Sequence, residues 1–103
     1  MIEDSVAIIA IFDLPGMTQA QYEQGTDKLT GGRGLVKKPA DWPVPGLISH
    51  TAAPTPNGWF VADVWESEEA FRQFGDIIMP ILREVGAPDM QPKIYPVFNL
   101  VTS

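Results

Sequence analysis

The sequence predicts an α+β domain with the element order β-α-β-β-α-β and one antiparallel sheet. Three observations support this prediction. A chain of 103 residues has room for one hydrophobic core. Four short apolar runs are bounded by breaks rich in Gly and Pro, and two of the intervening stretches have helical features. We therefore expect residues 1–103 to form a single domain, with a long Gly- and Pro-rich loop at residues 30–46.

The first strand and the first helix follow each other closely. Residues 6–13 (VAIIAIFD) are almost all apolar, as in a central strand that is covered on both faces. A Leu-Pro-Gly break ends this strand. Thr18 is then a typical helix N-cap, and Gln21 three residues later completes a capping box. We expect the first helix at about residues 19–29.

The loop at residues 30–46 (TGGRGLVKKPADWPVPG) has no usable periodicity. Structureless loops longer than roughly 12–15 residues are uncommon in compact domains and are usually functional or disordered. Trp42 is a large apolar side chain that a purely solvated linker does not need. The loop is therefore either a lid that tucks Trp42 onto the body and gates a pocket, or a connection that Trp42 simply anchors.

A hairpin is expected next, with strands at residues 47–53 and 59–66, because Asn57-Gly58 between them is a strong hairpin signal. Side chains alternate between the two faces of a strand. One face carries Ile48, His50 and Ala52 together with Trp59, Val61, Asp63 and Trp65, and the other carries Phe60, Ala62 and Val64. We expect the small apolar set to lie beneath the helices and the polar-plus-Trp set to lie on the other side of the sheet.

The last helix and strand complete the order. Ser67 is expected to cap the helix, Gly86 to end it, and Pro80 to kink it or make it restart. Its apolar stripe consists of Phe71, Phe74, Ile78, Ile81, Leu82 and Val85. The final strand is expected at residues 93–101, where Pro96 favours an edge position or a bulge.

This element order is that of a ferredoxin-like fold, an antiparallel sheet with both helices on one face. The other face of the sheet is then bare. Monomeric proteins rarely expose apolar patches larger than a few hundred Å². We therefore expect a homodimer in which two copies meet through their sheets.

Composition and charge exclude several classes of function. The net charge of −6 argues against a nucleic-acid partner. The absence of cysteine and the single histidine argue against a metal site. No apolar run reaches the roughly 18–20 residues of a membrane span, and the acidic start is unlike a signal peptide. We expect a cytoplasmic protein. Its basic residues cluster, because Lys28, Arg33, Lys37 and Lys38 are four of the seven, which indicates either a solvated loop or a basic flap over an anionic ligand.

His50 is the candidate catalytic base. Counting back through the turn places it opposite Asp63 or Trp65, and cross-strand neighbours are close enough for a His50–Asp63 hydrogen bond. A carboxylate on one ring nitrogen raises the basicity of the imidazole and leaves the other nitrogen to take a proton. The alternative is that both residues are structural. The candidate pocket-lining residues are Tyr22, Trp42, Ile48, Trp59, Val61 and Trp65.

The junction Trp65-Glu66-Ser67 followed by Glu68-Glu69-Ala70-Phe71 resembles that of the dimeric α/β-barrel superfamily, and in particular the antibiotic-biosynthesis-monooxygenase-like proteins. The resemblance covers roughly residues 6–101. It implies a dimer whose sheets build a barrel, and a small-molecule pocket in each protomer. The activities in this superfamily range from cofactor-independent oxygenation of polycyclic aromatics to polyketide cyclisation, heme degradation and no known catalysis.

Two departures from the family pattern bear on which of these activities the chain could have. The heme-degrading members carry a His on the second helix, and residues 70–85 contain none. The quinone-forming oxygenases use a Trp on the third strand with Asn, Tyr and Arg partners. Trp65 matches that Trp, but the other three have no clear equivalent here.

The resemblance implies an oxygenase-like or cyclase-like enzyme that needs neither metal nor flavin and acts on an apolar aromatic or polyketide-type substrate. The alternative is a non-catalytic ligand-binding or interaction module of the same fold.

Overall fold

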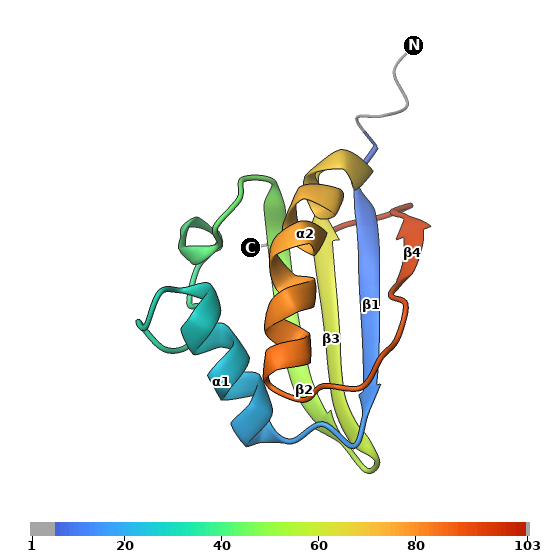
Figure 1. Ribbon diagram of the computed structural model, residues 1–103. Helices are drawn as coiled ribbons and strands as arrows, with labels where there is room; N and C mark the ends of the chain where they lie inside the picture. Colours follow the sequence, from blue (N-terminus) through green and yellow to red (C-terminus); the bar gives the residue numbers. More distant parts are fainter. Residues whose placement is uncertain (1–5, 103) are drawn as a thin grey trace.

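The computed structural model describes residues 6–102 and has two helices on one face of a four-stranded sheet (Figure 1). Its elements are β1 (Ile8–Pro15), α1 (Gln19–Leu29), the short 3-10 helix η2 (Pro39–Asp41), β2 (Leu47–Thr55), β3 (Gly58–Trp65), α2 (Glu68–Glu84) and β4 (Lys93–Pro96). The strand order is β2-β3-β1-β4, and all neighbouring strands are antiparallel. This confirms the predicted α+β, ferredoxin-like fold.

Local capping signals begin both helices where the sequence predicts. The backbone N–H of Gln21 donates to Thr18 Oγ1 at 3.2 Å, and the N–H of Thr18 donates to Gln21 Oε1 at 2.9 Å, which is the capping box. At α2, the N–H of Ala70 donates to Ser67 Oγ at 3.1 Å. These contacts satisfy donors that the first turn leaves free.

Pro80 does not interrupt α2, which continues from Glu68 to Glu84 as one helix. The predicted restart is therefore wrong. Gly86 follows the end of the helix, and its φ of 81° lies in the left-handed region that glycine adopts without strain. The N–H of Ala87 then donates back to the Leu82 carbonyl at 2.9 Å, as in a Schellman motif.

The fourth strand is shorter than residues 93–101. It ends at Pro96, which has no N–H to donate to the ladder. Pro96 lies on an edge strand, as predicted. After β4 the chain passes behind the sheet towards the β2 side (Figure 1).

The β2–β3 turn differs in detail from the prediction. Thr55 pairs with Gly58, so the two central residues are Pro56 and Asn57 rather than Asn57 and Gly58. Proline fixes φ near −65°, which excludes the positive φ that a type I′ turn requires. Gly58 has another role. A Cβ at this position would lie 2.3 Å from the Leu14 carbonyl oxygen, so only glycine lets the end of β1 pass this closely.

The assignment of the two sheet faces is reversed from the prediction. Trp59, Val61, Asp63 and Trp65 all lie beneath the helices, together with the buried alternate residues of β1. Trp65 is fully buried and its ring lies 5.0 Å from that of Phe74 on α2. The layer between a helix and a sheet accommodates these large rings.

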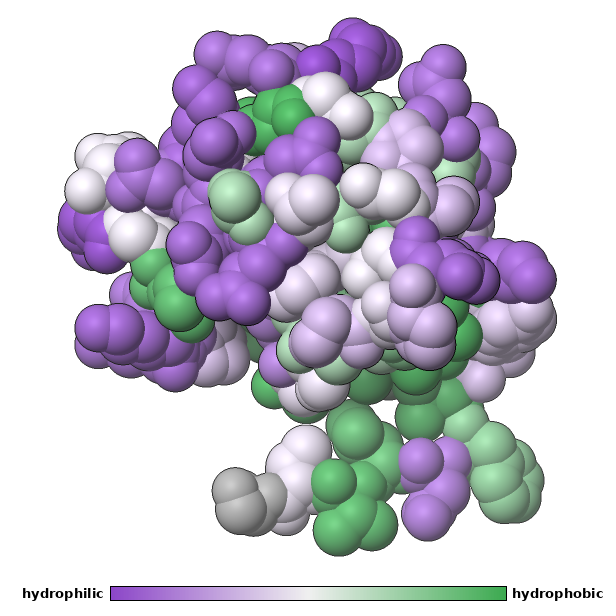
Figure 2. Space-filling model, turned by 90° about the horizontal axis from the view of Figure 1, so that it is seen from below, coloured by the Kyte–Doolittle hydropathy of each residue, from purple (hydrophilic) through white to green (hydrophobic). Residues whose placement is uncertain are grey.

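The outer face carries the small apolar set. Ile9 and Ile11 of β1 pair with Val64 and Ala62 of β3, and both isoleucines are only partly buried. β1 is therefore central, as predicted, but the helices cover only one of its two faces. The exposed large hydrophobic residues in residues 6–102 are Val6, Leu35, Ile94, Tyr95, Phe98, Leu100 and Val101. Figure 2 shows apolar residues gathered at one edge of the molecule, where they stand out from the main body.

The acidic start that argues against a signal peptide lies outside residues 6–102. Within those residues, neither helix has the length and apolar character needed to cross a bilayer.

The close approach at Gly58 leads to a stability prediction. Gly58→Ala should lower the free energy of unfolding by about 1–3 kcal/mol, because the new methyl group overlaps backbone atoms that cannot rotate away. Gly75→Ala is the matched control. It lies within α2 with nothing within 4 Å of the added Cβ, so it should stabilise by about 0.5–1 kcal/mol. Urea unfolding measures both. Equal effects of the two variants would contradict the packing argument.

Candidate active site

The site is built on a cross-strand pair between β2 and β3. His50 lies directly opposite Asp63 in the ladder, and its Nδ1 lies 2.5 Å from Asp63 Oδ1. Asp63 is 1% exposed, whereas the His50 side chain is 16% exposed. A carboxylate buried to this extent requires a strong hydrogen-bond donor. The predicted hydrogen bond is therefore present; the catalytic roles of the two residues stay a prediction.

Tyr22 of α1 extends this pair into a chain of three residues. Its hydroxyl oxygen lies 2.7 Å from His50 Nε2. The Tyr22 and His50 ring planes differ by only 6°, which suits a hydrogen bond in the plane of the imidazole. Trp59 stacks on the Tyr22 ring with centroids 5.1 Å apart and so holds it in position.

The Asp63 carboxylate, at one end of these three hydrogen-bonded residues, fixes which atom carries each proton. An ionised carboxylate only accepts, so His50 Nδ1–H donates to Asp63. The neutral imidazole then accepts at Nε2, and the Tyr22 O–H donates to it. Burial, with a further contribution from the negative charge of Asp63, raises the pKa of Tyr22 to about 12. Tyr22 is therefore a hydroxyl at neutral pH, and both nitrogens of His50 are occupied.

A small cavity of about 60 Å³ lies beside this chain, between the sheet and the two helices. Its walls are Phe12, Leu14, Met17, Tyr22, Gly25, Thr26, Leu29, Trp42, His50, Val61, Asp63, Phe74, Ile78 and Leu82. Most of these residues are apolar, and almost none of the surface that lines the cavity comes from polar atoms. Tyr22, His50 and Asp63 border the cavity, while their polar atoms are hydrogen-bonded to one another. The volume holds a few water molecules and is well below the roughly 300–1,000 Å³ of typical ligand sites.

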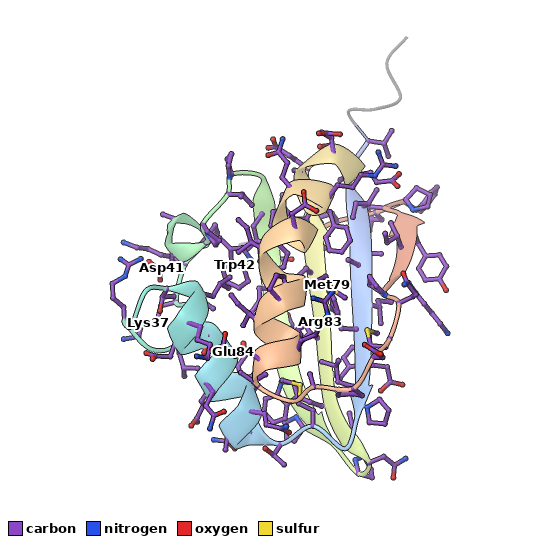
Figure 3. All side chains as sticks on the ribbon, in the orientation of Figure 1. Lys37, Asp41, Trp42, Met79, Arg83 and Glu84 are labelled. Atoms are coloured by element: carbon purple, nitrogen blue, oxygen red, sulfur yellow. The ribbon has the colours of Figure 1, made fainter. Side chains whose placement is uncertain are left out.

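Trp42 closes one side of the cavity from the long loop. It is 8% exposed, and its ring lies 4.7 Å from the His50 ring and 6.0 Å from Phe74. Figure 3 shows Trp42 pointing from the loop towards α2. The structure thus shows the loop anchored through Trp42; whether it gates the cavity stays a prediction.

The predicted lining residues separate into three groups. Tyr22, Trp42 and Val61 line the cavity with His50 and Asp63. Ile48 lines a second hollow on the other side of Trp42. Trp59 and Trp65 line neither of these hollows and pack within the core.

Sequence reasoning did not identify Tyr22 as the partner of His50. One signal was available, because Tyr22, Thr26 and Leu29 recur at helical spacing and all three line the cavity. The helix stripe residues Phe74, Ile78 and Leu82 form the facing wall. Within residues 6–102, no three His, Cys, Asp or Glu side chains come together as a metal site would require.

Comparison with known proteins places the fold. No family model matches the sequence, and no curated protein matches it. Solved structures do match. A protein of Shewanella loihica PV-4, provisionally described as a monooxygenase, is 18% identical with a TM-score of 0.55, and the match covers 93% of this chain and 98% of that one. SnoaB, a cofactor-independent oxygenase from Streptomyces nogalater, is 16% identical with a TM-score of 0.58 over 97% and 99% of the two chains.

A single-residue variant of SnoaB matches over the same shares of both chains with a TM-score of 0.56 and 15% identity. These identities are low, and the agreement is one of architecture over almost the whole length. The chain therefore shares the fold of these solved structures over almost its whole length.

Proposed function

We propose that this protein is a cofactor-independent oxygenase-like or cyclase-like enzyme that deprotonates an apolar aromatic or polyketide-type substrate. The observation that carries the proposal is the hydrogen-bonded chain Asp63–His50–Tyr22, which meets an apolar cavity. The oxygenase structures of the same fold support the choice of reaction class.

The hydrogen bonds suggest a proton relay rather than a bare histidine base. His50 Nε2 accepts from Tyr22 and so does not face the ligand with a free lone pair. A substrate hydroxyl in the cavity would donate to the Tyr22 oxygen while the Tyr22 proton moves to Nε2. The resulting imidazolium is stabilised by Asp63, which acts as a positioning residue. A free tyrosinate, which the raised pKa of Tyr22 opposes, is not needed.

Deprotonation is the first requirement of the oxygenase reaction. A phenolate is more electron-rich than the phenol and transfers electrons to dioxygen more readily. Conversion of a phenol ring into a quinone with one O₂ places one oxygen atom in the product and the other in water. The two hydrogens of that water come from the phenol O–H and the ring C–H, so no external reductant is required.

The rival is a non-catalytic ligand-binding module of the same fold. The positions of Trp59 and Trp65 outside the cavity wall favour it. Both functions require the ligand to widen the cavity. Only the enzyme requires the relay, so variants of the relay distinguish the two.

We also propose a homodimer, but its interface is the face of the sheet opposite to the one that the sequence suggested. Trp59, Val61 and Trp65 are covered by the helices of the same chain and leave no apolar surface to bury. The outer face of the sheet, with Ile9 and Ile11, takes their place, and Phe98 beyond β4 is fully exposed. The apolar side chains of this face would pack against a second sheet at the usual spacing of about 10 Å.

Turnover tests the relay. With 1,8-dihydroxyanthrone in air as the probe, Tyr22→Phe and His50→Ala should each lower kcat by about 10²- to 10⁴-fold, because each breaks the proton path. Tyr95→Phe is the matched control, since Tyr95 is the other tyrosine and is exposed on β4. Product is measured by mass spectrometry with ¹⁸O₂, after subtraction of autoxidation. Full activity in Tyr22→Phe with loss in His50→Ala would leave His50 as the direct base, and full activity in both would exclude the relay.

Alkaline titration tests the environment of Tyr22. In a Tyr95→Phe background Tyr22 is the only tyrosine, and its phenolate absorbance should rise with a midpoint near pH 12. Asp63→Asn should move the midpoint down, because the negative charge of Asp63 opposes ionisation. The folded-state pKa lies above the ordinary value of 10, so this contribution to stability is present below pH 10 and is lost as pH rises towards 12. A midpoint near 10 in the folded protein would contradict the burial of this hydroxyl.

Light scattering tests the dimer. The mass in dilute neutral buffer should be about 23 kDa, twice the 11.3 kDa of one chain. Phe98→Asp should shift the protein towards monomer, because it puts a charge into the proposed interface. Leu35→Asp, an exposed apolar residue of the long loop, is the control and should stay dimeric. A stable 11 kDa species for the unaltered chain would contradict the proposal.

A further inference from the structure

A groove of about 260 Å³ lies outside the cavity, between the long loop and β2. It is lined by Val36, Lys37, Lys38, Pro39, Trp42, Leu47, Ile48, Ser49 and His50. Its volume is several times that of the inner cavity and approaches the size of common small-molecule sites. The groove therefore has room for a ligand of one or two aromatic rings.

The polar end of this groove is basic, although the whole chain carries a net charge of −6. Lys37 and Lys38 both line it, and neither forms an ion pair with any residue of the described chain. Asp41 is the acidic group nearest in sequence. Its carboxylate accepts from the backbone N–H of Lys37 at 2.9 Å, and this bond, with the charges of Lys38 and Arg33 adding, holds the pKa of Asp41 below its usual range.

Asp41 does not line the groove, so the two lysines are the only charged side chains among the described residues of its wall. Charges separated by more than about 10 Å are largely screened at moderate salt. Asp41 is close to these lysines, but Arg33 also lies near it, so the loop beside the groove carries more positive than negative charge.

Trp42 and His50 connect the groove to the candidate active site, because both residues line the two hollows. The Trp42 indole N–H is buried and has no hydrogen-bond partner within residues 6–102. An unsatisfied buried donor costs about 1–3 kcal/mol. A movement of the Trp42 ring that brought this N–H against a ligand oxygen would remove this cost.

We propose that the groove binds an aromatic carboxylate. Its acid group would lie at Lys37 and Lys38, and its ring would lie against Trp42, on the side of the groove that His50 lines. The apolar walls from Val36, Leu47 and Ile48 suit the ring, and the lysines suit the acid. The inference deepens the proposed function and rests on it for one point only, namely that the ligand is the substrate. It identifies that substrate as an aromatic acid rather than a neutral phenol.

Calorimetric titration with 2-naphthoate and its methyl ester tests the groove, because the two probes share the ring and differ in charge. The unaltered protein should bind the acid more tightly than the ester. Lys37→Gln and Lys38→Gln should each weaken acid binding by about three- to fivefold, and the double variant by about tenfold or more, with ester binding unchanged. Added salt should weaken binding of the acid alone.

Lys93→Gln is the matched control, because Lys93 is exposed on β4 at the opposite edge of the sheet. It should keep the full preference for the acid. Equal affinity for acid and ester, an equal loss in the control, or no binding of either probe would each overturn the proposal.

Failure of this inference can be told apart from failure of the proposed function. If the unaltered protein shows no turnover, and both it and Tyr22→Phe still bind the acid more tightly than the ester, the groove is retained and the enzyme is excluded. Turnover that depends on Tyr22, in a protein that binds acid and ester equally, would retain the enzyme and remove the groove.

Discussion

The buried carboxylate of Asp63 is the constraint on which the rest of the site depends. It lies in the middle strand pair, beneath the helices and among large aromatic rings, where an unpaired charge is very unfavourable. His50 is the only hydrogen-bond partner found for its side chain in the described residues. The β2–β3 register must therefore bring His50 opposite Asp63, because a slip of one residue would turn the imidazole to the other face. Once His50 is fixed in this way, its remaining nitrogen points to α1, and Tyr22 meets it there.

The two faces of the sheet differ in the size of their side chains, and this difference positions the site. Trp59 and Trp65 fill the layer beneath the helices, and Trp59 also supports Tyr22. Their indole N–H groups, like that of Trp42, are buried without a partner within residues 6–102. At Trp59 and Trp65 the packing volume of the ring outweighs this cost, which is about 1–3 kcal/mol for each group. The apolar side chains of the other face, which include Ile9 and Ile11, are not covered by the helices.

The long loop combines two properties at one place. Trp42 anchors it against His50 and Phe74, so the loop forms part of the cavity wall. Its lysines stand at the groove on the other side of the same indole. Gly46, with φ of 109°, leads into β2, where a Cβ would lie 2.6 Å from that of Ala70. This tight passage holds the end of the loop against the start of α2 and thereby keeps Trp42 near the site.

The sequence by itself determined the features that depend on neighbouring residues. The capping box of α1, the Ser67 cap of α2, the Gly86 stop, the element order and the edge position of β4 follow from signals a few residues long. The His50–Asp63 pair follows from counting through a short hairpin. Three features were decided only by tertiary structure. Alternation separates the two faces of a strand but does not say which face the helices cover. The packing of the helices over the face with Trp59 and Trp65 decided this. The end of the fourth strand depends on its partner β1. The Tyr22–His50 bond joins residues 28 apart on a helix and a strand, so only the packing of α1 on the sheet brings them together.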